Sequence, residues 1–197
     1  PTQTPPARWE SPPAMEYYPP TSSVIMFGGY NGTPLSDTWS WNGTAWTQLF
    51  PTHSPSARSS HMMAYDTLSG IIVIFGGVAA NGSLLNDTWS WNGTTWTQLF
   101  PTTVPPARSG ACMVYDSLNS VITMFGGGLA GGTYSSGTWN FAGTGGGTYS
   151  WFALSPSTSP PARIFGSMVF DPVIGESILF GGLNGGVGSL QDLWVFN

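Results

Sequence analysis

The chain of 197 residues is long enough for one compact domain with its own core, and nothing in its length calls for two. Charged residues make up only 7%, and the four basic residues, all arginines, stand against nine carboxylates for a net charge of −5. This balance leaves no basic patch, which excludes binding to nucleic acid through a cationic surface. No run of about 18 apolar residues is present, so we expect no membrane insertion.

The uncharged polar composition favours a place outside the cell. Solubility has to come from Ser, Thr, Asn and Gln, a surface that suits a secreted protein carrying sugars. The candidate glycosylation sequons are Asn31, Asn42, Asn81, Asn86 and Asn92. Each sequon is a weak signal, because Asn-Gly-Thr is also a turn sequence. The single cysteine, Cys112, excludes an internal disulfide, and the start at Pro1 indicates a mature, trimmed or excerpted product.

Three unrelated landmarks recur along the chain with one period. Phe-Gly-Gly begins at positions 27, 75, 125 and 180, Pro-X-Ala-Arg ends at 8, 58, 108 and 163, and a Trp after Thr or Leu stands at 39, 89, 139 and 194. This shared period indicates four tandem copies of one structural unit in a single domain spanning 1–197. We place the repeats approximately at residues 5–50, 55–100, 105–154 and 160–197.

The first repeat begins less regularly than the second. Arg8 to Met15 is two residues longer than Arg58 to Met63, and the segment 9–20 is rich in proline. Because proline cannot donate to a β-ladder, we expect the first strand of this repeat to be degraded or irregular.

The second repeat reads as four short antiparallel strands. Residues 61–65 lead into a turn, and the β-branched run 71–75 follows and ends at Gly76-Gly77. Residues 87–91 alternate, Asn92-Gly93 is a hairpin signal, and 95–99 alternate again. No helical period is visible anywhere in the chain, so we expect an all-β fold.

The third and fourth repeats depart from this pattern. Trp89 to Trp96 spans seven residues but Trp139 to Trp151 spans twelve, which places five extra residues in the glycine-rich turn 143–147. Gly137 replaces the aspartate found at positions 37, 87 and 192. The fourth repeat stops just after its third strand, without the Trp-bearing fourth strand.

The repeat resembles the kelch superfamily, and more narrowly the secreted microbial kelch proteins. The residues that carry the likeness are Pro-Pro-Ala-Arg, Tyr-Asp, Phe-Gly-Gly, Asn-Asp-Thr-Trp and Trp-Asn-Gly-Thr-Thr-Trp, all found in the second repeat and the start of the third. The resemblance implies a β-propeller of four kelch-type blades, each of four antiparallel strands, with the last blade incomplete. It also implies that the strand after Arg58, Arg108 or Arg163 is innermost in its blade and that the Gly-Gly strand is second. Trp46, Trp96 and Trp151 would then lie on outermost strands. A closed four-bladed ring is favoured over an excerpt of a longer propeller and over an arc completed by another copy.

The candidate ligand-binding residues come from the repeated arginines, the alternating tryptophans and the loops after Gly-Gly. They are Arg8, Arg58, Arg108, Arg163, Tyr30, Asn31, Asn81, Tyr134, Asn184, Trp41 and Trp91. The arginines could clamp an anionic ligand, but we favour pairing of each arginine with an acid of a neighbouring blade, either Asp66, Asp116 or Asp171 or the Asp before Thr-Trp. Trp39, Trp89, Trp139 and Trp194 are expected in the core, and Trp41 and Trp91 are expected to be more exposed. The loops differ between repeats, which is typical of specificity elements.

These features favour binding over catalysis. Only His53 and His61 are available as histidines, and no spacing of ligands indicates a metal or a cofactor. The leading hypothesis is an extracellular binding or adhesion module that recognises a protein or glycan at the cell surface through loops of one propeller face. The alternative is a structural subunit of a surface layer or filament, which self-associates through blade edges. A glycan-active enzyme or oxidase is a third possibility.

Overall fold

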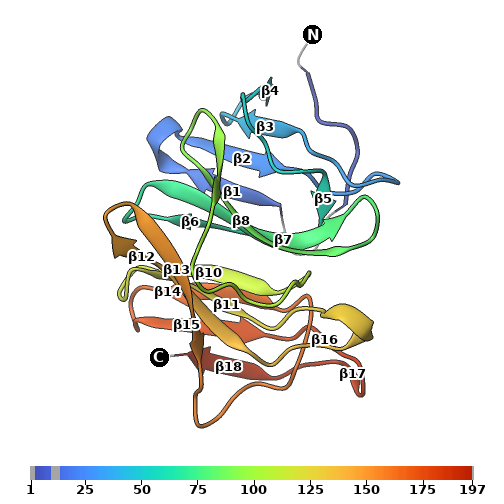
Figure 1. The fold of residues 1–197 in the computed structure, drawn as a ribbon, viewed down its shortest axis with the longest axis vertical. Helices are drawn as coiled ribbons and strands as arrows, with labels where there is room; N and C mark the ends of the chain where they lie inside the picture. Colours follow the sequence, from blue (N-terminus) through green and yellow to red (C-terminus); the bar gives the residue numbers. More distant parts are fainter. Residues whose placement is uncertain (1–2, 10–13, 197) are drawn as a thin grey trace.

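Short runs of β-branched and aromatic residues, separated by turns rich in Gly and Asn, make this an all-β protein. The computed structural model describes residues 3–9 and 14–196 and contains several antiparallel sheets (Figure 1). Neither of its two short 3₁₀ turns, η1 (Pro19–Thr21) and η2 (Ala130–Gly132), has the length or the apolarity to cross a bilayer.

The first sheet has four strands in sequence order. They are β1 (Met15–Tyr18), β2 (Ser23–Phe27), β3 (Thr38–Trp41) and β4 (Trp46–Leu49). The expectation of an irregular first strand is wrong, because β1 pairs in register with all of β2 from Ser23 to Met26. Of the prolines that motivated it, Pro19 and Pro20 form η1 between the two strands, and Pro12 and Pro13 lie outside the described residues.

The second sheet has five strands, because the loop after Gly76-Gly77 also forms β-pairs within the sheet. They are β5 (Arg58–Ser59), β6 (Met62–Asp66), β7 (Ile71–Ala79), β8 (Leu84–Trp91) and β9 (Trp96–Leu99). Gly76-Gly77 was expected to end a strand, but β7 continues through both glycines. A register shift between Phe75 and Gly77 accommodates the two glycines within the strand, so the β7–β8 hairpin continues to the turn at Asn81.

The third sheet again has four strands in sequence order. They are β10 (Cys112–Asp116), β11 (Val121–Phe125), β12 (Thr138–Gly145) and β13 (Thr148–Leu154). The five extra residues of this repeat lie where expected, since they lengthen the β12–β13 hairpin around its glycine-rich turn, with a register shift between Gly143 and Gly145.

The last repeat forms a three-stranded sheet and a separate small hairpin. The sheet contains β14 (Ser167–Asp171), β15 (Glu176–Phe180) and β18 (Leu193–Phe196), and the hairpin contains β16 (Leu183–Asn184) and β17 (Gly188–Ser189). Within residues 14–196, β18 pairs with β15 alone. The Trp-bearing fourth strand of the other repeats therefore has no counterpart here.

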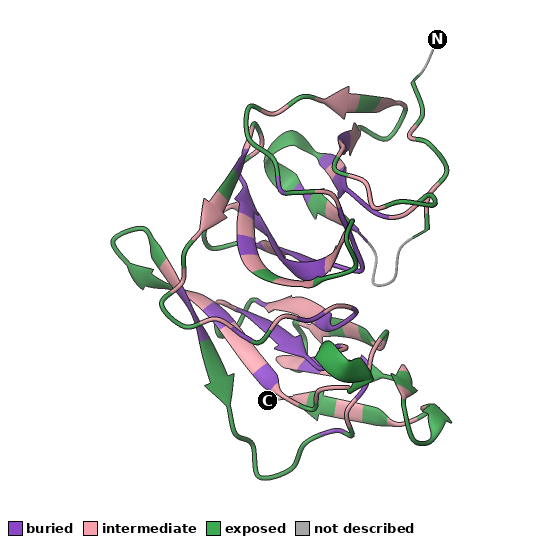
Figure 2. Cartoon of the chain, turned by 45° about the vertical axis from the view of Figure 1, so that its right-hand side comes forward, coloured by how far each residue is buried: buried purple, intermediate pink, exposed green. Residues whose placement is uncertain are grey.

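The sheets follow one another along the molecule in sequence order. The strands β1, β6, β10 and β14 form a row, in which β1 contacts β6, β6 contacts β10 and β10 contacts β14. The first and last sheets lie at opposite ends of this row in both views (Figures 1 and 2), and no described strand of one pairs with a strand of the other. The expected closed ring of four sheets is thus not found.

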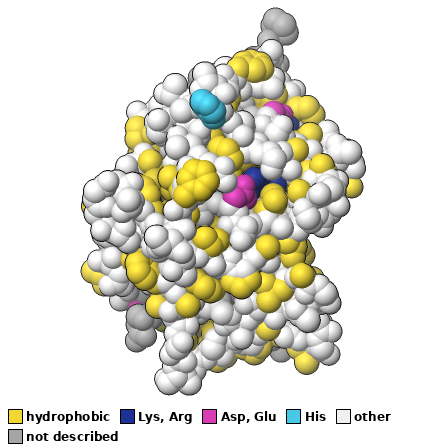
Figure 3. Space-filling model, in the orientation of Figure 1, with side chains coloured by type: hydrophobic (Ala, Val, Ile, Leu, Met, Phe, Trp, Pro, Cys, Tyr) yellow, Lys and Arg dark blue, Asp and Glu magenta, His cyan; other side chains and the backbone are white. Residues whose placement is uncertain are grey.

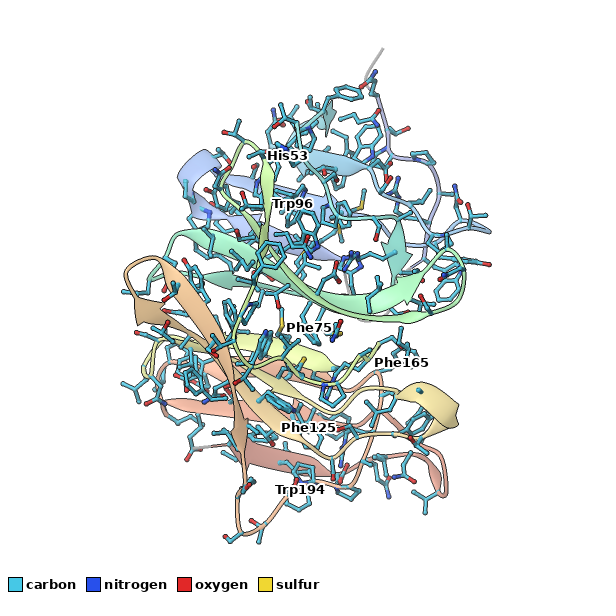
Figure 4. The ribbon with its side chains drawn as sticks, viewed as in Figure 1. His53, Phe75, Trp96, Phe125, Phe165 and Trp194 are labelled. Atoms are coloured by element: carbon cyan, nitrogen blue, oxygen red, sulfur yellow. The ribbon has the colours of Figure 1, made fainter. Side chains whose placement is uncertain are left out.

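A hydrophobic core fills each of the three spaces between neighbouring sheets. Trp96, Phe75 and Phe125, labelled in Figure 4, belong to the first, second and third of these cores. Alternate residues of β7 serve two cores at once, because Ile72 and Ile74 face the first sheet while Val73 and Phe75 face the third. This double burial explains why 71–75 is a continuous apolar run rather than an alternating one.

Candidate functional site

The repeated arginines are structural ion-pair partners in three of the four repeats. Each places its two terminal nitrogens 2.7 Å from the two carboxylate oxygens of the aspartate 29 positions later. The pairs are Arg8 with Asp37, Arg58 with Asp87, and Arg163 with Asp192. Figure 3 shows the consequence for the surface, where the few dark-blue atoms lie directly beside magenta ones. These guanidinium groups are already engaged within the chain.

Arg58, Arg108 and Arg163 also join neighbouring repeats through their main chain. The Arg58 N–H donates to the Leu35 carbonyl at 2.9 Å, and the Arg58 carbonyl accepts from Gly29 N–H at 3.0 Å, both in the preceding repeat. The Arg58 side chain, which is fully buried, bonds instead to Gly76 and Asp87 of its own repeat. The residue therefore holds two repeats together through its main chain, and the expected pairing of its side chain with an acid of a neighbouring blade is wrong, because Asp87 belongs to the same repeat.

Each paired carboxylate accepts a third hydrogen bond from the tryptophan two residues later. The Trp89 indole Nε1 donates to Asp87 at 2.7 Å. In the same way Trp39 donates to Asp37 and Trp194 donates to Asp192, each at 2.6 Å. Desolvation alone would raise the pKa of Asp87, but the bonds from Arg58 and Trp89 outweigh it and lower that pKa. The hydrogen bonds from Arg163 lower the pKa of Asp192 to about 2.

The aspartates of the Tyr/Phe-Asp motif are not the arginine partners. Asp66 and Asp116 instead accept hydrogen bonds from backbone N–H groups of the turns that follow, such as Leu68 and Leu118 at 2.9 Å. Asp171 accepts in the same way from Val173 at 2.8 Å. Their role is to fasten turns, which a short polar side chain does well.

Arg108 is the exception among the arginines. Gly137 occupies the position of its aspartate, and no carboxylate of the described residues lies within ion-pair distance. Its Nη1 donates to the Gly126 carbonyl at 2.8 Å and to Ser135 Oγ at 3.3 Å. Arg108 is only 2% exposed, and desolvation lowers the pKa of its guanidinium to about 10.

The loop candidates are divided between exposed and structural positions. Asn31 and Asn81 are exposed, and Tyr30 pairs with Trp9, which is 62% exposed, with ring centroids 5.2 Å apart. Asn184 is used internally, since its Nδ2 donates to the Ala162 carbonyl at 2.6 Å. Tyr134 is half-buried beside the loop of the fourth repeat.

The expected exposure of the alternating tryptophans is wrong for Trp91. Its side chain is fully buried and packs against Trp96, with ring centroids 5.2 Å apart, so no ligand can reach it. The reason is the first sheet, which covers this face of the second. Trp41, the equivalent residue in the first sheet, has no preceding sheet over it and is half-buried. Of the expected core tryptophans, Trp39 is buried, and Trp89, Trp139 and Trp194 are partly buried.

All five sequon asparagines are exposed, as glycosylation would require. Three of them also fasten turns, because their side-chain oxygens accept backbone N–H groups two residues later. These three are Asn42, Asn81 and Asn92, and the other two are Asn31 and Asn86. The turn interpretation is confirmed, and glycosylation stays a prediction.

A groove along β1, β6, β10 and β14 is the feature that the sequence analysis missed. It comprises two adjoining hollows of about 380 and 440 Å³, both lined by Glu16, Met113 and Met168. Methionine occupies the same position in β1, β6, β10 and β14, two residues before Tyr17, Tyr65, Tyr115 and Phe170. The Met-X-Tyr/Phe repeat was visible in the sequence, but only strand order reveals that it faces one groove.

Glu16 is the one acidic residue in this groove wall. It takes the position held by Ala64, Val114 and Val169 in the other repeats. Burial raises the pKa of its carboxyl to about 7, against a smaller lowering by the Tyr17 backbone N–H. An alignment of the four repeats would have singled it out as the only charged residue at that position.

No metal site or reactive thiol accompanies these features. Among residues 3–9 and 14–196, no three His, Cys, Asp or Glu side chains come together. Cys112 packs in the third core as expected, donates from Sγ to the Gly166 carbonyl at 3.0 Å, and has its pKa raised by burial to about 12.

Neither a scan against protein-family models nor a search of curated proteins finds a match for this chain. The likeness to kelch repeats rests on the chain's own period and motifs.

Proposed function

We propose that the chain is an open arc of kelch-type β-propeller blades that acts as a binding module outside the cell. The kelch assignment is supported by the period, by the row of contacts that joins β1, β6, β10 and β14, and by the sheets of neighbouring antiparallel strands that the repeats form. The extracellular assignment rests on the nearly uncharged polar surface and the exposed sequons. The observation that carries the binding role is the groove along β1, β6, β10 and β14.

The chemistry of the groove favours a protein ligand over a glycan. Methionine side chains are flexible and polarisable and adapt to varied apolar partners, whereas sugars need many convergent hydrogen-bonding groups. Met15 is 46% exposed at one end of the row, and Tyr17 beside it is 51% exposed. Apolar side chains of an extended partner segment fit this lining. The residues of the loop face, Tyr30 and Trp9 above all, form a second possible contact area.

A peptide-display selection against the immobilised chain tests this proposal, with a glycan array as the parallel arm. Peptides rich in apolar residues should be enriched, and the double variant Met15→Gln, Met168→Gln should weaken their binding at least tenfold. Phe100→Gln is the matched control, since Phe100 is 82% exposed and does not line the groove. Binding lost in Tyr30→Ser but kept in the methionine variant would move the site to the loops. Binding of glycans alone would contradict a protein ligand.

A structural subunit that assembles through sheet edges is the second candidate. Beside the unpaired edge of β18 lies a hollow of about 310 Å³ whose lining includes Thr138, Ser177 and Phe196. The hydroxyls of Thr138 and Ser177 are buried, and neither has a hydrogen-bond partner among the described residues. A strand with a tryptophan, added from a neighbouring subunit, would cover both. Light scattering tests this: a mass that stays at 20.9 kDa over a wide concentration range counts against assembly.

A further inference from the structure

Three of the four repeats bind a carboxylate group with the same donors in the same arrangement. In the second repeat these donors are the two terminal nitrogens of Arg58, each 2.7 Å from an Asp87 oxygen, and the Trp89 indole N–H at 2.7 Å. The first and fourth repeats reproduce these distances within 0.1 Å. The arrangement is a carboxylate receptor whose ligand belongs to the chain itself.

The third repeat has the donors of this receptor but not its carboxylate. Arg108 and Trp139 stand at the positions of Arg58 and Trp89, and Gly137 stands at the position of Asp87. Ser135 replaces the lost acceptor only in part, since its Oγ receives one Arg108 nitrogen at the longer distance of 3.3 Å. Neither Arg108 Nη2 nor Trp139 Nε1 forms a hydrogen bond within the described residues. Two donors are thus left for a group from outside the chain.

The place of the missing carboxylate is open to solvent. The aspartates of the other three repeats have side-chain exposures of 19%, 22% and 33%, so an external ligand can approach along the route their side chains occupy. The backbone of Gly137 is not in the left-handed region, and a Cβ built on it would be 3.2 Å from Ser135 Oγ and 3.5 Å from Trp139 Nε1. A free carboxylate, which is not bonded to the Gly137 Cα, has to bind farther out than that Cβ, in the space beside Ser135 Oγ and Trp139 Nε1.

The electrostatics also favour an anion. Arg108 is 2% exposed and keeps its charge at neutral pH, because its pKa falls only to about 10. A buried cation without a counterion is costly, and a bidentate carboxylate is the partner whose geometry matches a guanidinium best.

We propose that Arg108 and Trp139 form a binding site for a carboxylate supplied from outside the chain. The ligand's two oxygens accept hydrogen bonds from Arg108 Nη2 and Trp139 Nε1, farther from the Gly137 Cα than a covalently attached aspartate side chain would be, with the Ser135 hydroxyl beside them. A free small carboxylate and the side chain of an acidic residue in a bound polypeptide share this chemistry. The site does not depend on the groove proposed above, because it lies at the base of the loop 128–136 and needs only local geometry.

An NMR titration of the tryptophan indole N–H signals with sodium acetate tests the proposal. The Trp139 signal, identified from its loss in Trp139→Phe, should shift with saturation at about millimolar acetate. Sodium chloride at equal ionic strength should leave it in place. The Trp39, Trp89 and Trp194 signals serve as internal references, since their N–H groups already bind an aspartate. A Trp139 signal that responds equally to acetate and chloride overturns the proposal.

Two variants at one position separate occupation of the site from a change of backbone. Gly137→Asp supplies the carboxylate internally, so it should abolish the acetate shift and raise the melting temperature. Gly137→Ala adds only a methyl group without a carboxylate, so it should not raise the melting temperature. If Gly137→Asp fails to fold, Arg108→Gln takes its place and should also remove the shift. Persistence of the shift in either of these carboxylate-blocking variants would refute the site.

The two sources of the carboxylate are distinguished with blocked tripeptides. Acetyl-Gly-Asp-Gly-amide should shift the Trp139 signal at lower concentration than acetate if the site serves an acidic side chain, and acetyl-Gly-Asn-Gly-amide should not shift it. Response to acetate without response to the Asp peptide assigns the site to small free carboxylates.

Discussion

The Trp151 indole Nε1 donates a hydrogen bond to Thr88 Oγ1 at 3.0 Å, across 63 residues and between two sheets. Trp96 and Thr38 form the same bond between the first and second sheets, also at 3.0 Å. All four side chains are buried, so each bond satisfies a donor and an acceptor that water cannot reach. Thr138 is the equivalent threonine of the third repeat, and its hydroxyl has no hydrogen-bond partner among the described residues.

Thr88→Val is expected to lower the free energy of unfolding by about 2 kcal/mol, because it leaves the buried Trp151 N–H without an acceptor. Thr138→Val removes a hydroxyl that receives nothing, so it should be neutral or slightly stabilising. Urea unfolding of both variants checks this. Equal losses would mean that the hydrogen bond itself contributes little.

Asp87→Asn is expected to cost about 3 kcal/mol, since it leaves the fully buried Arg58 guanidinium without its counterion. The change keeps the shape of the side chain, so the loss reports on charge. Asn86→Ala, at an exposed neighbouring position, is the control and should change stability by less than about 0.5 kcal/mol. An Asp87→Asn protein as stable as the parent would show that Arg58 does not need the ion pair.

Gly76→Ala should destabilise the protein far more than Gly82→Ala. Both glycines have positive φ, +63° and +81°, and an alanine at either pays roughly 1 kcal/mol for that conformation. At Gly76, however, the new methyl would also lie 2.6 Å from the Arg108 carbonyl oxygen, whereas nothing lies within 4 Å of it at Gly82. Thermal melting of the two variants isolates the cost of the close approach, and similar melting temperatures would argue against it.

The stability of the chain should rise slightly on mild acidification and fall only in strong acid. The folded pKa of Glu16, about 7, lies above its ordinary value of 4.5, so its contribution is fully present below pH 4.5 and is lost as pH rises through 7. The pKa values of Asp37, Asp87 and Asp192 are lowered, so their contributions are present above pH 3.8 and are lost as pH falls further.

Melting temperatures between pH 8 and pH 2 check this dependence. Glu16→Gln should remove the rise between pH 7 and 4.5 and leave the acid limb unchanged. A steep decline of the melting temperature between pH 7 and 4, with or without the substitution, would contradict both the raised pKa of Glu16 and the lowered pKa values of the three aspartates.

The local structure of this protein could be read from its sequence. The period, the strand positions, the glycine-rich hairpin of the third repeat and the missing fourth strand of the last repeat follow from alternation and turn residues. These signals act between close neighbours along the chain. The β1 strand was misjudged because prolines near a strand were treated as prolines in its ladder. Gly76-Gly77 was misjudged as the end of a strand, because a β-bulge allows a strand to continue through two glycines.

The site could be predicted only in part. The sequence showed that each repeat has one arginine and about two aspartates, and that Gly137 breaks the pattern. It did not show which aspartate pairs with which arginine, since the partner lies 29 residues away in a different part of the sheet. Nor did it show that Arg108 and Trp139 converge on one point.

By itself, the sequence determined that the chain is a four-fold repeat of short antiparallel strands with almost no charge. The tertiary structure alone decided what each repeated residue meets, because that depends on the neighbouring sheet. Trp91 is buried where Trp41 is half-buried, as one has a sheet in front of it and the other does not. The shared groove of the methionines and the open row of sheets have the same origin. Both depend on how the sheets pack on each other and not on any one strand.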